Sequence, residues 1–245
     1  MDRLKHKVAL VTGSSKGIGK AVAILLAKHG AKVIVNHSNS SREAEATVNE
    51  IVNNGGQAMA IKADVSDKEQ VTRLFDQSIA AFGKIDVLVN NAGTMISKRL
   101  KDNTQQDFTH QFEVNVRGVF NTLQEADNQL ADHGKIINFS SSTTRLMLPT
   151  YALYSATKAA VEQMTRVYSK EIGRGISVNA LAPGATETEL FLKGKSQEQI
   201  DRLSAMNAFN RLAHPSDIAK VVLFLASDDS SWISGQVIGA NGALV

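Results

Sequence analysis

The sequence predicts an α/β fold in which one doubly wound parallel sheet of about seven strands is covered by helices on both faces. Short β-branched runs alternate along the chain with longer stretches of helical character, the order typical of βαβ units. The 245 residues are 43% hydrophobic and 21% charged, a balance typical of compact globular proteins. Because no internal repeat and no low-complexity linker interrupts this pattern, we expect a single domain over residues 1–245.

The first half of the chain is expected to contribute four strands. The apolar residues of Ile18–His29 cover most of a helix surface, which predicts a buried crossover helix that ends before Gly30. Asn36–Asn54 contains the next helix with its loop, and Ser66–Glu69 fits a capping box for a helix that ends at about Phe82. The predicted strands are Val8–Val11, Val33–Val35, Gln57–Lys62 and Val87–Val89.

The second half continues the alternation. Its predicted helices are Thr104–Leu130 with one interruption, Tyr151–Ile172 and Ile218–Ala226. Its predicted strands are Ile136–Phe139, Gly175–Leu181 and Gln236–Gly239.

An insertion at Ala185–Arg211 follows Pro183-Gly184 and has weaker periodicity, with two short helical pieces. Because it follows the carboxyl end of a strand, we expect it to form a lid that shapes a substrate pocket. The alternative is that it only completes the core or a subunit contact. The side chains expected to make the pocket apolar are Leu190, Phe191, Leu192, Leu203, Met206 and Phe209, approached by Leu146, Met147 and Tyr151.

A glycine-rich loop, Thr12–Gly19, separates the first strand from its helix. Glycines there permit a tight turn and bring backbone N–H groups close to a pyrophosphate at the helix N-terminus, where the helix dipole favours anions. An ordinary βα loop is the alternative, but the position of the loop favours cofactor binding. Its candidate cofactor-binding residues are Gly13, Ser15, Lys16, Gly17, Ile18 and Gly19.

A second loop of small residues, Asn90–Gly93, follows the fourth strand directly. In an open parallel sheet, ligands bind outside the carboxyl ends of the strands near the topological switch point. A strand-terminating turn is the alternative. We expect Asn91, Ala92 and Gly93 to contact the cofactor, because small residues let the chain pass close to it.

Tyr154 and Lys158 stand four residues apart near the start of a predicted helix and so share one helix face. A cation in contact with a phenol lowers its pKa by about 1–3 units, which would make Tyr154 a workable proton donor. Such pairs are common on surface helices, but this one follows a strand that ends in Ser140–Ser142.

Asn115 lies inside a predicted helix and predicts a local kink, since Asn competes for backbone hydrogen bonds.

Together these motifs resemble the short-chain dehydrogenase/reductase family, from about Lys5 to Gly242. The resemblance implies a Rossmann-type fold and hydride transfer between a nicotinamide and a ketone or secondary alcohol. Tyr154 would donate the proton, and Lys158 would lower the pKa of Tyr154 and hold the cofactor ribose. Ser141 would bind the carbonyl oxygen, because the family serine lies thirteen residues before the tyrosine.

The resemblance implies further roles. Asn115 would hold a water that links Lys158 to solvent, and the chain would form a homotetramer. At the C-terminus, Ala240–Ala243 departs from the usual acidic, double-glycine version, which weakens the inference about subunit packing. The remaining cofactor contacts are implied at Asp64, Val65, Pro183, Gly184, Thr186 and Thr188.

The end of the second strand predicts NADPH rather than NADH as the cofactor. NAD-preferring folds place a carboxylate there to bind the ribose 2′-hydroxyl. This chain has Asn36, His37 and Ser38 at that point, with no acid before Glu43. Lys16 in the glycine loop can add a donor for the 2′-phosphate of NADPH.

Composition excludes other classes of protein. The 27 basic and 24 acidic residues are spread along the chain, so no nucleic-acid partner is expected. No cysteine is present and the six histidines lack ligand spacing, so no metal is expected. The longest apolar run, Ala21–Ala27, is too short to span a membrane, and we expect a cytoplasmic protein.

Two alternatives to a carbonyl reductase with a small-molecule substrate stay open. One is the 3-oxoacyl-carrier-protein reductase of fatty acid synthesis, since the resemblance extends to that group as well as to the carbonyl reductases. The other is a non-catalytic regulator that senses NADP, which the fold can support. The presence of Ser141, Tyr154 and Lys158 argues against the second.

Overall fold

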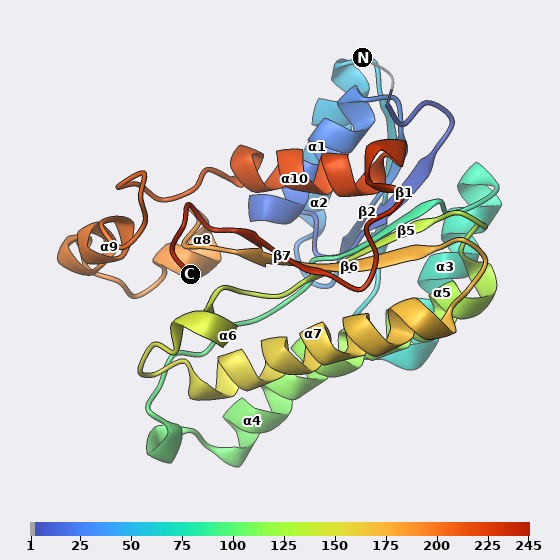
Figure 1. Ribbon diagram of the computed structural model, residues 1–245. Helices are drawn as coiled ribbons and strands as arrows, with labels where there is room; N and C mark the ends of the chain where they lie inside the picture. The colour runs from blue at the N-terminus through green and yellow to red at the C-terminus, as the bar shows by residue number, and fades with distance from the viewer. Residues whose placement is uncertain (1–2) are drawn as a thin grey trace.

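The computed structural model describes residues 3–245 and contains one seven-stranded sheet (Figure 1). The strand order is β3-β2-β1-β4-β5-β6-β7, and all neighbouring strands are parallel. The strands are β1 Val8–Val11, β2 Lys32–His37, β3 Gln57–Lys62, β4 Val87–Asn90, β5 Lys135–Phe139, β6 Ser177–Pro183 and β7 Val237–Ala240. The predicted doubly wound parallel sheet is confirmed; residues 1–2 of the expected domain lie outside the described residues.

Helices form a layer on each face of the sheet (Figure 1). One layer holds α1 Gly17–Lys28, α2 Ser41–Asn53 and α10 Pro215–Ala226. The other holds α3 Lys68–Phe82, α4 Gln105–Phe112, α5 Gly118–Gln129 and α7 Ala152–Glu171. Shorter helices are α6 Thr143–Leu146, α8 Glu189–Leu192, α9 Gln197–Ser204 and the 3-10 turns Leu100–Asp102 and Asp228–Ser230.

Two apolar cores fill the spaces between the sheet and its helix layers. In β1, Ala9 and Val11 join the core beneath α1 and α10, whereas Leu10 joins the opposite core with Leu74 and Phe75 of α3. Successive side chains of a strand point to opposite faces, so a strand covered on both sides must be apolar throughout. This explains why β1 is apolar throughout.

The sheet has its topological switch point at β1, which pairs with β2 on one side and β4 on the other. The chain leaves β1 and β4 toward opposite helix layers, which opens a crevice at their carboxyl ends. Figure 1 shows α6 and α8 at this same edge of the sheet, where β5 and β6 end. The fold therefore gathers four loops at one place.

The structure corrects several local expectations. Helix α3 is capped by Asp67, whose side chain accepts a hydrogen bond from Gln70 N at 3.0 Å, so the expected capping box from Ser66 does not form. The predicted interruption at Asn115 is a π-helical turn, Glu113–Arg117, that joins α4 to α5. Asn36 and His37 belong to β2 rather than to the following loop.

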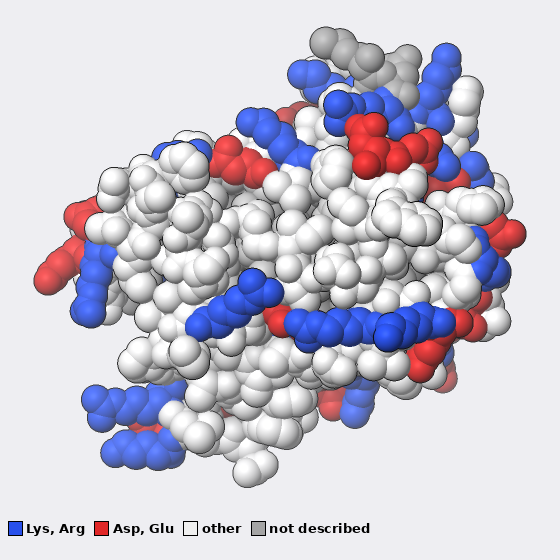
Figure 2. Space-filling model, in the orientation of Figure 1, with Lys and Arg blue, Asp and Glu red and all other residues white. Residues whose placement is uncertain are grey.

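The surface carries mixed charge. Figure 2 shows basic and acidic side chains around the rim of one face and a row of basic side chains across its middle, with a largely uncharged area over α8 and the C-terminal segment. Within residues 3–245, no helix is both long and apolar enough to cross a bilayer.

Candidate active site

The glycine loop after β1 lies tightly against the loop after β4. Gly13 and Gly17 have positive φ angles of 59° and 58°. A Cβ built on Gly13 would lie 2.8 Å from Ala92 Cα, and one on Gly19 would lie 2.5 Å from Asn91 Nδ2. The two loops can approach this closely only because these positions lack a side chain.

The N-terminus of α1 faces this loop with free backbone donors. Its N-cap, Lys16, has extended φ and ψ and makes no side-chain cap. Among residues 3–245, none accepts a hydrogen bond from the N–H of Gly17, Ile18 or Gly19, and the first turn holds no acidic residue. Such a helix end attracts anions through its N–H groups and its dipole.

Asn36 and Asn91 hold the glycine loop in place. The side chain of Asn91 donates to the carbonyls of Thr12 and Gly13, both at 2.9 Å. Buried Asn36 accepts from Gly13 N at 3.2 Å and donates to the carbonyls of Ile61 and Ala63. Both residues were expected to bind the cofactor, but these side-chain polar groups bond to the protein itself.

The end of β2 carries a different polar group. The side chain of His37 is buried, and its Nδ1 has no hydrogen-bond partner within residues 3–245. Burial and then nearby Lys62 lower the pKa of His37, while Glu45 opposes them. Ser38 next to it is exposed. The described end of β2 therefore offers an unpaired imidazole and no carboxylate of its own.

Lys16 does not extend toward the end of β2. Its Nζ lies 2.7 Å from Glu189 Oε2 in α8. Ser15, next to it in the loop, is buried, and its carbonyl accepts from Thr47 of α2 at 3.2 Å. The structure thus pairs Lys16 with the insertion, an arrangement that the sequence did not indicate.

Three consecutive serines after β5 differ in their partners. Ser140 Oγ donates to Glu162 at 2.7 Å, and Ser142 Oγ donates to the Ala182 carbonyl at 3.2 Å. Ser141 Oγ accepts from the backbone N–H of Thr143 at 3.2 Å and also contacts the phenol of Tyr154. Of the three, Ser141 is the serine directed at Tyr154.

Asn115 and Lys158 meet beside Gly93. A Cβ built on Gly93 would lie 3.2 Å from Asn115 Oδ1 and 3.5 Å from Lys158 Nζ. Buried Asn115 accepts from Thr94 N at 2.8 Å and donates to Thr94 O and to Thr157 Oγ1. The π-helical turn brings this side chain into the loop after β4.

Burial shifts the pKa values of the central pair in opposite directions. It raises the pKa of Tyr154 to about 12, against an opposing hydrogen bond with Ser141, and lowers the pKa of Lys158 to about 8. Lys158 Nζ lies 5.8 Å from the centre of the Tyr154 ring and donates to the Phe139 carbonyl at 2.9 Å. The ammonium therefore faces the ring rather than the hydroxyl, and the expected lowering of the phenol pKa by Lys158 is absent from this arrangement.

The remaining candidate residues lie around the same crevice. The carboxylate of Asp64 accepts two hydrogen bonds from Ser66, and buried Val65 packs against Gly118. Thr188 caps α8, with its methyl group facing Gly17. Pro183, Gly184, Thr186 and Thr188 border the cavity next to the serine loop.

A cavity of about 170 Å³ connects these groups. One wall carries Ser141, Tyr154 and Lys158. The apolar side chains that line it include Leu146, Leu148, Tyr151, Leu190, Phe191, Leu203, Met206, Met95 and Leu244. Met95, Leu148 and Leu244 were not expected; Met95 follows Gly93 by two residues, a usable signal, whereas nothing in the sequence indicates Leu244.

Three residues expected in the pocket lie outside this lining. Phe209 is 69% exposed and borders a separate hollow near the C-terminal segment, and Met147 is 82% exposed. Leu192 is not part of the lining, although its neighbour Phe191 is. Side chains rotate by about 100° per residue along a helix, so the side of α8 that carries Leu190 and Phe191 leaves Leu192 outside the lining.

These features define the class of nucleotide-binding α/β oxidoreductases: a glycine loop at a helix N-terminus, and a serine, tyrosine and lysine on the wall of an adjoining cavity. A family profile described as "Enoyl-(Acyl carrier protein) reductase" matches residues 13–243. The chain is a member of the short-chain dehydrogenase/reductase family, as its motifs indicated.

Relatives and solved structures are similar over nearly the whole chain. Versicolorin reductase stcU of Emericella nidulans is 43% identical, over 98% of this chain and 96% of the relative. A probable tetrahydroxynaphthalene reductase of Zymoseptoria tritici is 41% identical, over 99% and 96%. The crystal structure of the angucycline C-6 ketoreductase LanV with bound NADP has a TM-score of 0.93 and 36% identity, over 99% and 96%.

Proposed function

We propose that this protein is an NADPH-dependent ketoreductase that interconverts a ketone and a secondary alcohol on an apolar or aromatic substrate. The observation that carries the proposal is the placement of Ser141, Tyr154 and Lys158 on one wall of a cavity that is otherwise mainly apolar. When bound, the reduced nicotinamide supplies the hydride, and the protein supplies the proton and the binding of the carbonyl oxygen.

The residues present fit a dinucleotide phosphate. The free N–H groups of Gly17, Ile18 and Gly19 would hold the pyrophosphate. The unpaired Nδ1 of His37 and the absence of a carboxylate from the described end of β2 favour a 2′-phosphate over a 2′-hydroxyl. NADP bound to LanV gives this assignment support from a related fold.

Ser141 and Tyr154 would bind the substrate carbonyl oxygen with their hydroxyl groups. Because the pKa of Tyr154 is raised to about 12, the phenol stays protonated near neutrality and has a proton to give. An alkoxide is a much stronger base than a phenolate, so proton transfer from Tyr154 to the developing alkoxide is downhill. This assigns Tyr154 as the general acid in the direction of reduction.

Lys158 would restore that proton. With a pKa of about 8, its ammonium can lose and regain a proton close to physiological pH. Asn115 and the ammonium lie near the same point beside Gly93, and Asn115 would orient a water there, as the family resemblance implies. Lys158 would also hold the cofactor ribose.

The substrate class follows from the apolar lining. Phe191, Leu203 and Met206 of the insertion, with Tyr151 and Leu146 on the other side, favour a flat apolar ring over a polyhydroxylated sugar. The names of two relatives, versicolorin reductase and tetrahydroxynaphthalene reductase, support a ring-bearing substrate. The names of these relatives do not favour the alternative 3-oxoacyl-carrier-protein reductase.

That the protein forms a homotetramer in the cytoplasm stays a prediction.

The test is turnover of Tyr154→Phe on a panel of cyclic aromatic ketones and a 3-oxoacyl thioester, with NADPH and with NADH. The variant keeps the ring and loses only the proton donor, so we expect kcat to fall by about 10²–10⁴-fold while NADPH binding persists. If the variant keeps more than a few per cent of the wild-type kcat, Tyr154 is not the general acid. Preference for the thioester would favour the alternative.

A further inference from the structure

Helix α7 carries four polar side chains at intervals of four residues: Tyr154, Lys158, Glu162 and Arg166. Residues at this spacing lie on one face of a helix. The first two line the cavity, whereas Glu162 lies one turn deeper and is not part of its lining. The proposed reaction leaves Glu162 without a role.

Glu162 is a buried carboxylate whose two oxygens are both engaged. Its side chain is 8% exposed. Oε1 accepts hydrogen bonds from Ser140 Oγ at 2.7 Å and from Thr144 Oγ1 at 2.8 Å. Oε2 lies 3.4 Å from Arg166 Nη2. One carboxylate oxygen thus binds two hydroxyl groups that flank Ser141.

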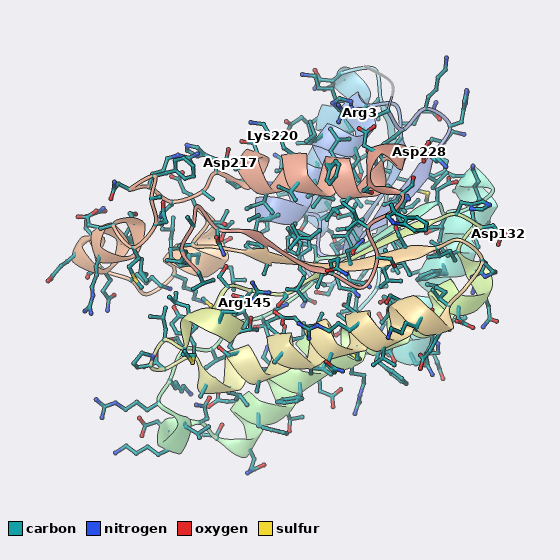
Figure 3. The ribbon with its side chains drawn as sticks, viewed as in Figure 1. Arg3, Asp132, Arg145, Asp217, Lys220 and Asp228 are labelled. Carbon is teal, nitrogen blue, oxygen red and sulfur yellow. The ribbon has the colours of Figure 1, made fainter. Side chains whose placement is uncertain are left out.

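The segment that bears Ser141 is held from two sides. Its backbone continues the sheet, because Ser140 N donates to Leu181 O at 2.7 Å and Ser142 N donates to Pro183 O at 3.0 Å. Its side chains at positions 140 and 144 bind α7 through Glu162. Figure 3 shows Arg145 of α6, the helix that contains Thr144, beside the first turns of α7.

Helix α7 also binds the end of β5 itself. Lys158 Nζ donates to the carbonyl of Phe139, the residue directly before Ser140. Lys158 and Glu162 therefore bind adjacent residues of the strand end from consecutive turns of the same helix. Tyr154 lies one turn before Lys158 on that helix, so the same contacts set the separation of Tyr154 and Ser141.

We propose that Glu162 is a positioning residue, which holds Ser141 against Tyr154 by binding Ser140 and Thr144 at once. This inference rests on the proposed ketoreductase function and extends it to a residue outside the cavity. A displacement of about 1 Å in a group that binds the reacting oxygen can lower the rate by about 10²-fold. Glu162 would therefore influence kcat without touching the substrate.

Two substitutions separate charge from hydrogen bonding. Glu162→Gln keeps an oxygen that can accept from both hydroxyls, while Glu162→Ala removes the acceptor. We expect Glu162→Ala to lower kcat about 10- to 100-fold, with the Kd for NADPH nearly unchanged, and Glu162→Gln to restore kcat to within about threefold of wild type. Glu171→Ala, an exposed carboxylate on the same helix, is the matched control.

A primary deuterium isotope effect with deuterated NADPH gives a readout that misfolding does not move. If the chemical step is slowed, the isotope effect on kcat increases in Glu162→Ala, whereas a smaller fraction of folded enzyme leaves it as in wild type. Ser140→Ala combined with Thr144→Val should reproduce the loss of kcat, and adding both to Glu162→Ala should lower kcat no further.

Wild-type kcat in Glu162→Ala would overturn the inference, as would equal losses in the Ala and Gln variants with an unchanged isotope effect. Additive losses in the combined variant would also overturn it. Tyr154→Phe assayed in parallel distinguishes the two proposals. If Tyr154→Phe is inactive and Glu162→Ala is normal, only the Glu162 inference fails; if wild type and Tyr154→Phe reduce ketones equally, the proposed function fails.

Discussion

Lys16 Nζ lies 2.7 Å from Glu189 Oε2, and this ion pair joins the glycine loop to the first residue of α8. Both side chains are more than half exposed, so solvent screens the pair and it adds little to stability. Next to it, the methyl group of Thr188 faces Gly17. Lys16, which is expected to bind the cofactor phosphate, therefore pairs with a carboxylate of the insertion that borders the substrate cavity.

Competition for Lys16 predicts that Glu189→Gln binds a 2′-phosphate more tightly. Removing the carboxylate frees the ammonium, so we expect the affinity for 2′,5′-ADP to rise by up to about fivefold and that for 5′-AMP to stay the same. Lys16→Met should lower the affinity for 2′,5′-ADP and leave the affinity for 5′-AMP unchanged. Isothermal titration calorimetry measures both ligands, with exposed Glu187→Gln as the control. Equal changes in the affinities for the two nucleotides would contradict competition between Glu189 and the 2′-phosphate for Lys16.

The end of β2 predicts the effect of His37→Asp. A carboxylate there would bind a ribose 2′-hydroxyl and repel a 2′-phosphate, so the ratio of kcat/KM for NADPH to that for NADH should fall by roughly tenfold or more. The control is His110→Asp, which introduces the same charge at an exposed position of α4. If wild type uses both cofactors equally well, the end of β2 does not select the phosphate.

Two neighbouring residues of α8 provide a matched test of the lid. Phe191 lines the cavity and Leu192 does not. We expect Phe191→Ala to raise KM for an aromatic ketone by roughly tenfold or more, as expected for a lost apolar contact, and Leu192→Ala to leave it unchanged. Thermal unfolding checks stability, which should change little because Phe191 is only partly buried. Similar KM values for both variants would place the substrate elsewhere.

The lowered pKa of Lys158 predicts a pH dependence of stability. The folded protein binds this proton less tightly than the unfolded chain, whose lysine has the ordinary pKa of 10.5. The free energy of unfolding therefore gains a contribution as pH rises from about 8 to 10.5, at most about 3 kcal/mol. Urea unfolding at pH 7.5, 9 and 10 measures it.

Lys158→Met should lose this contribution. The free energy of unfolding of wild type should therefore rise relative to that of the variant as pH rises. Lys170→Met, at the other end of the same helix, is the control and should follow wild type. A wild-type curve that runs parallel to that of Lys158→Met across this range would show that the buried ammonium keeps an ordinary pKa.

Local features of the sequence were sufficient for the architecture. Strand β1 is a short apolar run because both of its faces are buried. Periodicity indicates the longer helices, and Gly30 and Gly83 mark the ends of α1 and α3. The motifs around Gly13, Asn91, Tyr154 and Asn115 could be placed for the same reason: each follows a strand or interrupts a helix at a position that local patterns reveal. Even the π-helical turn had its signal in Asn115.

The tertiary structure alone decided what these polar side chains bind. Glu162 and Ser140 are 22 residues apart, Lys16 and Glu189 are 173 apart, and nothing in the local pattern of either pair indicates the other. Asn36 is expected at the cofactor, and the structure shows its side chain in a buried network that links the glycine loop to the end of β3. Periodicity reports which face of an element is buried, but a hydrogen bond needs two specific atoms within about 3 Å, and only the packing of the whole chain sets that distance.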